Sequence, residues 1–161
     1  MTQVKIKLNG GIMPKKATDG AAAYDLYVPE DTEIQSGRQI IDLKFSIELP
    51  QGYAATIQPR SGFSAKGLEA VVDDRYFDDE SELYDKRLDA DVIRGLIDCD
   101  YRGSVGVILK VDEYHDIMLI KKGTRIAQMQ IVQVPQIELV EAETLSDTDR
   151  GEGGFGSTGA R

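Results

Sequence analysis

The chain has very few of the residues on which disulfides, metal sites and histidine chemistry depend. Cys99 is its only cysteine, so no disulfide can form within the chain, and a reducing compartment fits. Cys99 lies between two aspartates, where we expect it to fill a small apolar gap. His115 is the only histidine, and its charged neighbours favour a solvated loop position. We assign chemistry to neither residue.

Long hydrophobic runs and an excess of positive charge are also missing. The 161 residues carry 28 acidic and 19 basic side chains, a formal net charge of −9. DNA and RNA attract clustered Lys and Arg, so we expect no binding to a nucleic-acid polymer. The first residues contain no apolar signal region, and no stretch approaches a membrane-spanning length. We therefore expect a cytoplasmic protein with one properly cored domain and no membrane contact.

What the sequence does contain is a series of β-strand patterns. Between residues 41 and 49 every odd position is apolar and every even position is polar or charged, the period of a half-buried strand. Residues 105–111 repeat this alternation, and residues 127–131 continue it. Shorter candidate strands, bounded by Gly and Pro, lie at residues 4–8, 24–28 and 53–58. The sequence predicts an all-β sandwich or jelly roll made of short strands.

Residues 69–94 depart from that pattern. They carry ten acidic and four basic side chains, a net charge of −6. Tyr84, Leu88 and Val92 are spaced by four, which favours a short amphipathic helix that starts near Ser81. We interpret the segment as an insertion on the surface of the β domain. Its acidic pairs lack the Gly-containing spacing of a calcium loop, so a solvated acidic face is favoured over a Ca²⁺ site.

The last dozen residues combine glycine, hydroxyl and aromatic side chains. Five glycines lie between Arg150 and residue 159. Glycine lets the backbone approach a ligand closely, and successive N–H groups attract phosphate oxygens. Arg150 adds a planar cation, Ser157 and Thr158 add hydroxyls, and Phe155 can lie flat on a planar base. A frayed terminus is the alternative, but a lone Phe among glycines favours an arm that closes over a nucleotide.

Four further segments carry residues suited to a ligand rather than to packing. They are Ala-Tyr-Asp-Leu at 23–26, Pro-Arg-Ser-Gly-Phe-Ser-Ala-Lys-Gly at 59–67, Gly-Leu-Ile-Asp-Cys-Asp-Tyr-Arg-Gly at 95–103 and Gly-Thr-Arg-Ile-Ala-Gln at 123–128. Together with the C-terminal arm, their order and content resemble the five motifs of the trimeric dUTPase family. The resemblance covers essentially the whole chain outside residues 69–94.

The resemblance implies a fold, an activity and an assembly. The fold is a dUTPase-like jelly roll of residues 1–149, followed by a nucleotide-closing arm of residues 150–161. The activity is hydrolysis of dUTP to dUMP and pyrophosphate with Mg²⁺ as cofactor, which limits uracil in DNA and supplies dUMP for dTMP synthesis. The assembly is a homotrimer whose active sites lie at the subunit interfaces.

The chemistry of residues 95–103 agrees with this resemblance. Glycines at both ends favour a β-hairpin whose backbone groups can read the edge of a base. By family similarity, the backbones of Gly95 and Ile97 contact uracil, and Tyr101 lies under the deoxyribose. Asp98 matches the carboxylate that orients the water attacking the α-phosphorus. Ordinary turn chemistry is the alternative for Asp98, because Asp favours turns.

Other matched residues are expected to hold the triphosphate or to brace the site. Arg60 and Ser61 follow a strand at the start of an expected helical turn, where exposed N–H groups favour an anion; for Arg60 a surface ion pair is the alternative. Gln128 alternates away from the core, so its amide is expected to be free for the α-phosphate. Asp25 and Arg125 are expected to pair in a supporting role. The phosphate-binding set implied by the resemblance is Arg60, Ser61, Gly62, Gln128, Arg150, Gly156, Ser157 and Thr158.

Mg²⁺ is expected to be held by substrate phosphates and water, with no direct protein ligand. Phe155 is expected to stack on uracil, where base–aromatic stacking contributes roughly 1–3 kcal/mol.

Two other functions stay open at this stage. A dCTP deaminase, or a bifunctional deaminase–diphosphatase, shares the sandwich fold but needs a differently placed acid. A regulatory protein could retain the nucleotide pocket and use residues 69–94 as its interface. Because this segment enters between the second and third motifs, it must lie near the pocket rim, where it could act as a lid, a trimer contact or a site for an unknown protein partner.

Overall fold

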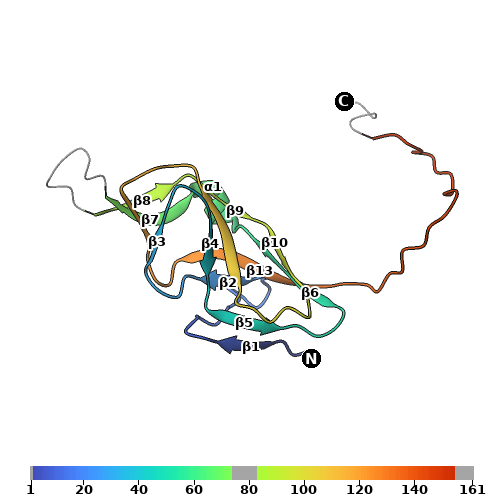
Figure 1. The fold of residues 1–161 in the computed structure, drawn as a ribbon, viewed down its shortest axis with the longest axis horizontal. Helices are drawn as coiled ribbons and strands as arrows, with labels where there is room; N and C mark the ends of the chain where they lie inside the picture. Colours follow the sequence, from blue (N-terminus) through green and yellow to red (C-terminus); the bar gives the residue numbers. More distant parts are fainter. Residues whose placement is uncertain (1, 74–82, 155–161) are drawn as a thin grey trace.

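The structure is a computed structural model that describes residues 2–73 and 83–154. Within these ranges the chain forms 13 short strands and one helix, which confirms the all-β prediction. Figure 1 shows the strands wound around a common interior. No helix in the described ranges is long and apolar enough to cross a membrane.

The strands form four antiparallel sheets. The first pairs β1 (Lys5–Leu8) with β5 (Phe45–Glu48). The second has the order β10 (Gly95–Ile97), β6 (Tyr53–Gln58), β13 (Arg125–Gln133), β2 (Tyr24–Tyr27). The third has the order β4 (Gly37–Asp42), β11 (Gly106–Val111), β9 (Ala90–Ile93). The fourth has the order β3 (Thr32–Ile34), β12 (Ile117–Ile120), β7 (Leu68–Asp73), β8 (Tyr84–Leu88).

The alternation of residues 41–49 places five side chains in one continuous hydrophobic core. These are Ile41, Leu43, Phe45, Ile47 and Leu49. The segment is two strands, however, because β4 ends at Asp42 and β5 begins at Phe45. Between them Lys44 takes a left-handed backbone conformation, with φ +53°. This bend passes the chain from the third sheet to the first without moving the apolar side chains off the core.

Residues 69–94 are not a helical surface insertion in their described part. Leu68–Asp73 is strand β7, and Tyr84–Leu88 and Ala90–Ile93 are strands β8 and β9. Leu88, Ala90 and Val92 are buried, which is a period of two, and a spacing of four is twice that period. The helix expectation was wrong because the same apolar residues satisfy both patterns over such a short stretch. The start expected near Ser81 lies outside the described residues.

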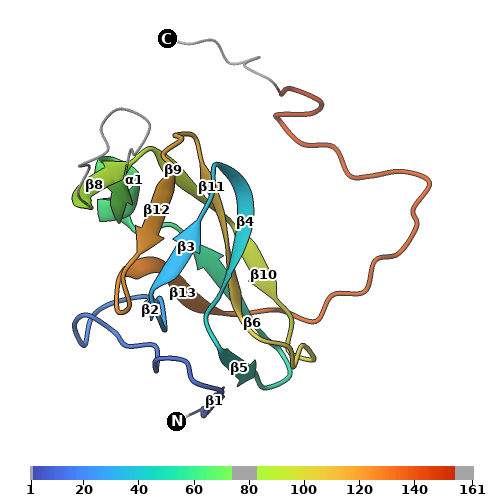
Figure 2. The same cartoon turned by 60° about the vertical axis from the view of Figure 1, so that its left-hand side comes forward.

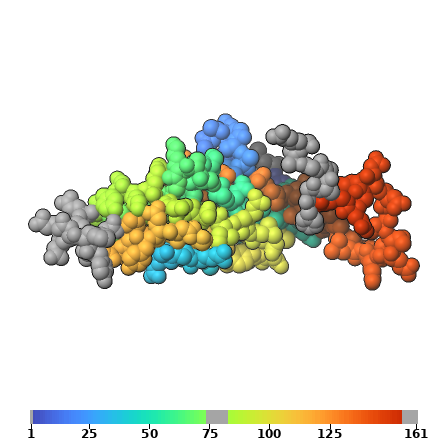
Figure 3. Space-filling view, turned by 90° about the horizontal axis from the view of Figure 1, so that it is seen from above, coloured from blue at the N-terminus to red at the C-terminus, as the bar shows by residue number. Residues whose placement is uncertain are grey.

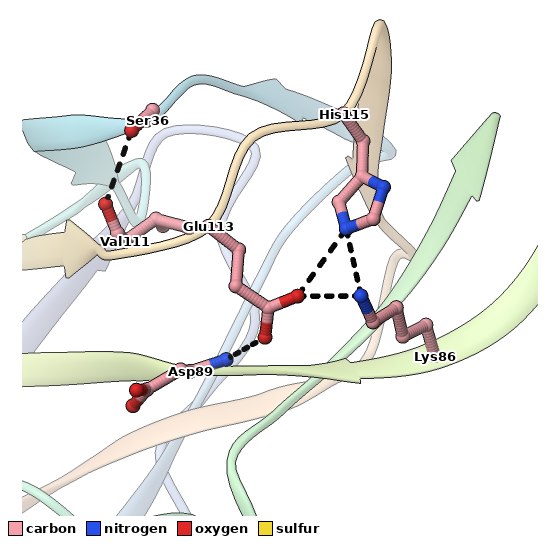
Figure 4. A network of polar contacts seen from close by, with 6 residues as sticks. All are labelled: Ser36, Lys86, Asp89, Val111, Glu113 and His115. Atoms are coloured by element: carbon pink, nitrogen blue, oxygen red, sulfur yellow. Dashed lines mark hydrogen bonds and ion pairs between the residues drawn. The ribbon is translucent and has the colours of Figure 1, made fainter. Parts of the chain in front are cut away.

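His115 is not a solvated loop residue. Its side chain is only 9% exposed, and its Nε2 lies 2.9 Å from Lys86 Nζ and 3.3 Å from Glu113 Oε2 (Figure 4). Lys86 Nζ also contacts Glu113 Oε2 at 2.5 Å, and the Asp89 N–H donates to Glu113 Oε1 at 2.6 Å. The Lys86 ammonium, followed by the Asp89 N–H, lowers the pKa of Glu113 to about 2. This cluster ties β8 and the start of β9 to the loop between β11 and β12.

After β13 the chain leaves the body. Residues 134–154 contain no described strand or helix, and nearly all are exposed. Figures 1 and 2 show this segment running away from the sheets, and Figure 3 shows it at the opposite end of the molecule from β8. The predicted boundary at residue 149 stays a prediction, although the compact part ends near Gln133.

Candidate functional site

A buried carboxylate joins three of the predicted segments. Asp25, on β2, is 7% exposed, and its Oδ1 accepts a hydrogen bond from Arg60 Nε at 2.8 Å. Its Oδ2 lies 3.4 Å from Arg125 Nη1, at the start of β13. The Asp25–Arg125 pair expected from the sequence is therefore present. The ion pair considered as the alternative for Arg60 is also present, but it is largely buried rather than on the surface.

Gln128 differs from its expectation. It lies opposite Asp25 in the β2–β13 ladder, on the predicted face of β13. Its amide Nε2 donates to the Pro59 carbonyl at 3.1 Å, so one of the two amide N–H donors is already used. This contact forms because Pro59 directly follows β6, and β6 pairs with β13. The contact holds Pro59 and the following Arg60 against the sheet.

Arg60 and Arg125 line a pocket of about 260 Å³, called the basic pocket below. Its walls contain four cationic side chains: Arg60, Lys66, Arg87 and Arg125. Two carboxylates oppose them, Glu69 in the wall and Asp25 behind it, so four positive and two negative charges leave a local charge of +2. In a chain of net charge −9, such a pocket is suited to an anion.

The short helix α1 (Ser61–Lys66) forms one side of the basic pocket. Arg60 is its N-cap residue and has an extended backbone, which confirms the predicted helical turn after a strand. Gly62 lines the pocket, and Ser61 is exposed at the start of the helix. Phe63 is the buried residue that fixes the helix to the core.

A second pocket, of about 180 Å³, lies between β10 and β11 and is called the base pocket below, after the base contacts expected of its residues. Gly95, Ile97 and Tyr101, the three described residues expected to contact the base and sugar, all line it. The predicted hairpin is incomplete, however. The Tyr101 N–H donates to the Asp98 carbonyl at 3.2 Å and closes a turn, but β10 pairs with β6 and β11 pairs with β4 and β9. β10 is therefore an edge strand, with one backbone edge beside the pocket.

Gly103 controls the position of Tyr101. A Cβ atom built on Gly103 would lie 2.3 Å from the Tyr101 hydroxyl and 2.5 Å from its Cζ, so only glycine admits the ring in this place. The hydroxyl donates to the Ser104 carbonyl at 3.0 Å. Arg102 Nη1 donates to the carbonyls of Cys99 and Tyr101 and closes the turn further. Cys99 packs against the core, as expected.

Asp98 lies at the end of β10, between two residues that line the base pocket, and it is exposed. Within the described ranges its carboxylate has no ion-pair partner. The base pocket and the basic pocket share no lining residue. Within the described residues, neither of these two pockets brings Asp98, Tyr101 and the arginines of the basic pocket together.

Arg150 lines neither of the two pockets. Its Nε donates to the Gly153 carbonyl at 2.8 Å, inside a local turn of the extended segment. The predicted arm residues Phe155, Gly156, Ser157 and Thr158 lie outside the described residues. Among residues 2–73 and 83–154, no group of three or more His, Cys, Asp or Glu side chains could hold a metal ion.

Sequence reasoning missed two cations of the basic pocket, Lys66 and Arg87. Lys66 could have been predicted, because it belongs to the ligand-suited segment 59–67 and ends α1. Arg87 gave no signal of its own, because it lies in the acid-rich segment and reaches the pocket only through the pairing of β8 with β7.

Comparison with known proteins covers nearly the whole chain. The dUTPase family model matches residues 9–79 and 80–159. A deoxyuridine 5'-triphosphate nucleotidohydrolase of Beijerinckia indica subsp. indica is 40% identical over 157 residues, which cover 93% of this chain and 84% of the relative.

Two solved structures share the fold. The dUTPase of Staphylococcus bacteriophage 80alpha with dUPNHPP has a TM-score of 0.79 and 25% identity, and the match covers 99% of each chain. A mutant dUTPase of phage phi11 of S. aureus, described with a structural Mg(II) ion, has a TM-score of 0.69 and 19% identity over 89% of this chain and 98% of that one. The family-model match and the bacterial relative together establish the family: this chain belongs to the dUTPases.

Proposed function

We propose that this protein hydrolyses dUTP to dUMP and pyrophosphate. The observation that carries the proposal is the pair of pockets built from the family-like segments. One is small and bordered by a free strand edge and a tyrosine, and the other is lined by arginines braced on a buried carboxylate. A planar base and a polyphosphate are the two ends of a nucleoside triphosphate, and each pocket suits one of them.

The base pocket supports discrimination for uracil. The backbone edge of β10 offers N–H and C=O groups in fixed positions, which can match the acceptor–donor–acceptor edge of the base. Gly103 leaves room for the Tyr101 ring and the Ser104 carbonyl accepts from its hydroxyl, so the ring forms one wall for the deoxyribose. A ribose 2′-hydroxyl or a 5-methyl group would have to displace this wall, which favours deoxyuridine over uridine and thymidine nucleotides.

The basic pocket supports binding of the phosphate chain. Asp25 fixes the guanidinium groups of Arg60 and Arg125, so they lose little freedom when they meet phosphate oxygens. Ser61 and Gly62 add a hydroxyl and backbone N–H groups at the same edge. Phosphoryl transfer is mainly positioning and charge stabilisation, and this is what such a pocket provides.

Asp98 supplies the chemistry of the attacking water. Its exposed carboxylate, at the end of β10, accepts a proton from that water and orients it toward the α-phosphorus. Arg150 and the arm residues Phe155, Gly156, Ser157 and Thr158 close over the bound nucleotide. Phe155 stacks on the base, and the others contact the phosphates.

Mg²⁺ fits a site completed by the substrate. Mg²⁺ keeps several waters and binds substrate phosphates readily, so most of its oxygens would come from phosphate and water. When bound, Mg²⁺ neutralises the charge on the phosphate chain and on the departing pyrophosphate.

Assembly into a trimer completes the site. In one chain the two pockets are separate, and the segment that carries Arg150 leaves from the opposite end of the body to β8 (Figure 3). An apolar stripe crosses the third sheet, where Ile40, Ile108 and Ile93 align in register; Ile40 is 72% exposed, and Ile108 and Ile93 also line the base pocket. Such a stripe is suited to contact with another copy of the chain.

Mixing two inactive variants tests the activity and the shared site together. Asp98→Asn keeps the arm but lacks the carboxylate, and the chain ended after Asp149 keeps the carboxylate but lacks the arm. Each alone should release almost no pyrophosphate from dUTP. Co-refolded at equal amounts, they should regain about one quarter of wild-type activity, since half the carboxylates and half the arms are intact and combine at random. A mixture as inactive as its components would contradict a site shared between copies.

A further inference from the structure

We propose that Arg87, on strand β8, is an additional phosphate-binding residue that takes the distal phosphates of the substrate, and that Glu69 occupies its guanidinium until they arrive. The proposal deepens the function proposed above and rests on it. It also gives the acid-rich segment 69–94 a role in the site itself.

The position of Arg87 follows from strand alternation along β8. Its neighbour Lys86 turns into the cluster with Glu113 and His115, which anchors the strand (Figure 4). Arg87 points to the other side of the strand, where it lines the basic pocket with Arg60 and Arg125. The anchor on one face of β8 therefore fixes where the guanidinium on the other face can reach.

The contacts of Arg87 are exchangeable. Its Nη2 pairs with Glu69, directly opposite on β7, and its Nη1 lies 3.4 Å from the Gly67 carbonyl. The Arg87 and Glu69 side chains are 45% and 65% exposed, so the pair contributes little to stability. Arg87 also lines a neighbouring hollow of about 480 Å³, which shares Glu69 and Thr124 with the basic pocket. The guanidinium thus has room to turn from a single carboxylate to a phosphate chain of higher charge.

The experiment uses substitutions expected to act in opposite directions. Arg87→Gln should raise the Kd for Mg²⁺-tripolyphosphate and the KM for dUTP by roughly 3- to 10-fold, because a charged hydrogen bond is lost. Glu69→Gln should lower both by roughly 2- to 5-fold, because the competing carboxylate is gone. Neither should change the Kd for dUMP, which lacks the distal phosphates, and Arg87→Lys should restore part of the affinity.

Two controls separate a local contact from general charge effects. Lys5 and Glu48 form a matched exposed cross-strand pair, at 2.8 Å between β1 and β5, and neither lines the basic pocket. Lys5→Gln and Glu48→Gln should leave the Kd for Mg²⁺-tripolyphosphate and the KM for dUTP unchanged. Lys121→Gln removes a cation that lines the neighbouring hollow but not the basic pocket, and it should also leave them unchanged.

The outcomes are decisive and separable from the activity itself. If Arg87→Gln and Glu69→Gln shift the two constants in the same direction, or if Lys121→Gln matches Arg87→Gln, then Arg87 is not a phosphate ligand. If wild-type protein does not hydrolyse dUTP but the tripolyphosphate pattern holds, the proposed activity fails and the anion site stands. If dUTP is hydrolysed and Arg87→Gln behaves as wild type, the activity stands and this inference fails.

Discussion

We predict that replacing Asp25 lowers both the folding stability of the protein and its affinity for substrate. It is 7% exposed and meets Arg60 at 2.8 Å and Arg125 at 3.4 Å. Breaking a fully buried ion pair costs about 3–5 kcal/mol. The arginine side chains keep 24% and 50% exposure and can recover water, and an asparagine retains one acceptor oxygen. We therefore expect Asp25→Asn to cost about 1.5–3 kcal/mol of folding free energy.

The assay is thermal unfolding at one fixed protein concentration, because assembly contributes to the midpoint. For a domain of this size, the expected cost lowers the midpoint by about 4–10 °C. Asp31→Asn is the exposed control. Asp31 pairs with Lys121 at 3.1 Å, both side chains are about half exposed, and an asparagine keeps an acceptor oxygen for the Lys122 N–H that Asp31 binds at 2.8 Å. That variant should keep the wild-type midpoint.

A double-mutant cycle divides the stability cost of Asp25→Asn between its two partners, Arg60 and Arg125. The coupling of Asp25→Asn with Arg60→Gln should exceed its coupling with Arg125→Gln, because the first pair is shorter and more buried. The KM for dUTP should rise in every one of these variants, since Asp25→Asn leaves both arginines without their carboxylate and each arginine variant removes a cation from the basic pocket. Equal midpoints for Asp25→Asn and Asp31→Asn would refute the reasoning.

Three further predictions concern Asp98, the C-terminal arm and Glu113. Asp98→Asn should lower kcat by about 10²- to 10⁴-fold with little change in KM, measured as pyrophosphate release; a large rise in KM at normal kcat would instead make Asp98 a binding residue. The chain ended after Asp149 should lose turnover yet keep the wild-type unfolding midpoint, and near-normal turnover would remove the arm from the mechanism. The Glu113 pKa, lowered to about 2 from an ordinary 4.5, means that its contribution is complete above pH 4.5 and is lost as the pH falls toward 2. Compared with Glu113→Gln, the wild type should therefore be more stable by about 1 kcal/mol at neutral pH, and this advantage should shrink to nothing near pH 2; an advantage independent of pH would contradict it.

The strand content and most of the site were predictable because they depend on local patterns. Alternation over residues 41–49 specified which side chains enter the core, and the pairing of Asp25 with Arg125 could be expected from their segments, whereas the buried pair of Asp25 with Arg60 was not predicted. The break at Lys44 was not predictable, since a lysine with positive φ leaves the apolar period intact. Likewise the burial of His115 depends on Lys86 and Glu113, which a loop sequence does not reveal.

Long-range pairing explains the remaining differences. One N–H of the Gln128 amide is used because β6 places the Pro59 carbonyl within 3.1 Å of its nitrogen, a contact set by strand register. The hairpin expected at residues 95–103 is open because its two sides are recruited by different sheets. Residues 84–93 satisfy both a helical and an extended spacing, and only their partners β7 and β11 decide between them.

Release of pyrophosphate from dUTP, dTTP, UTP and dCTP, each with Mg²⁺ and with EDTA, tests the central claim most directly. We expect rapid release from dUTP with Mg²⁺, almost none with EDTA, and turnover of the other three nucleotides lower by at least about 100-fold, because the Tyr101 ring and the backbone edge of β10 reject them. Comparable turnover of dTTP or UTP, or ammonia released from dCTP, would contradict it.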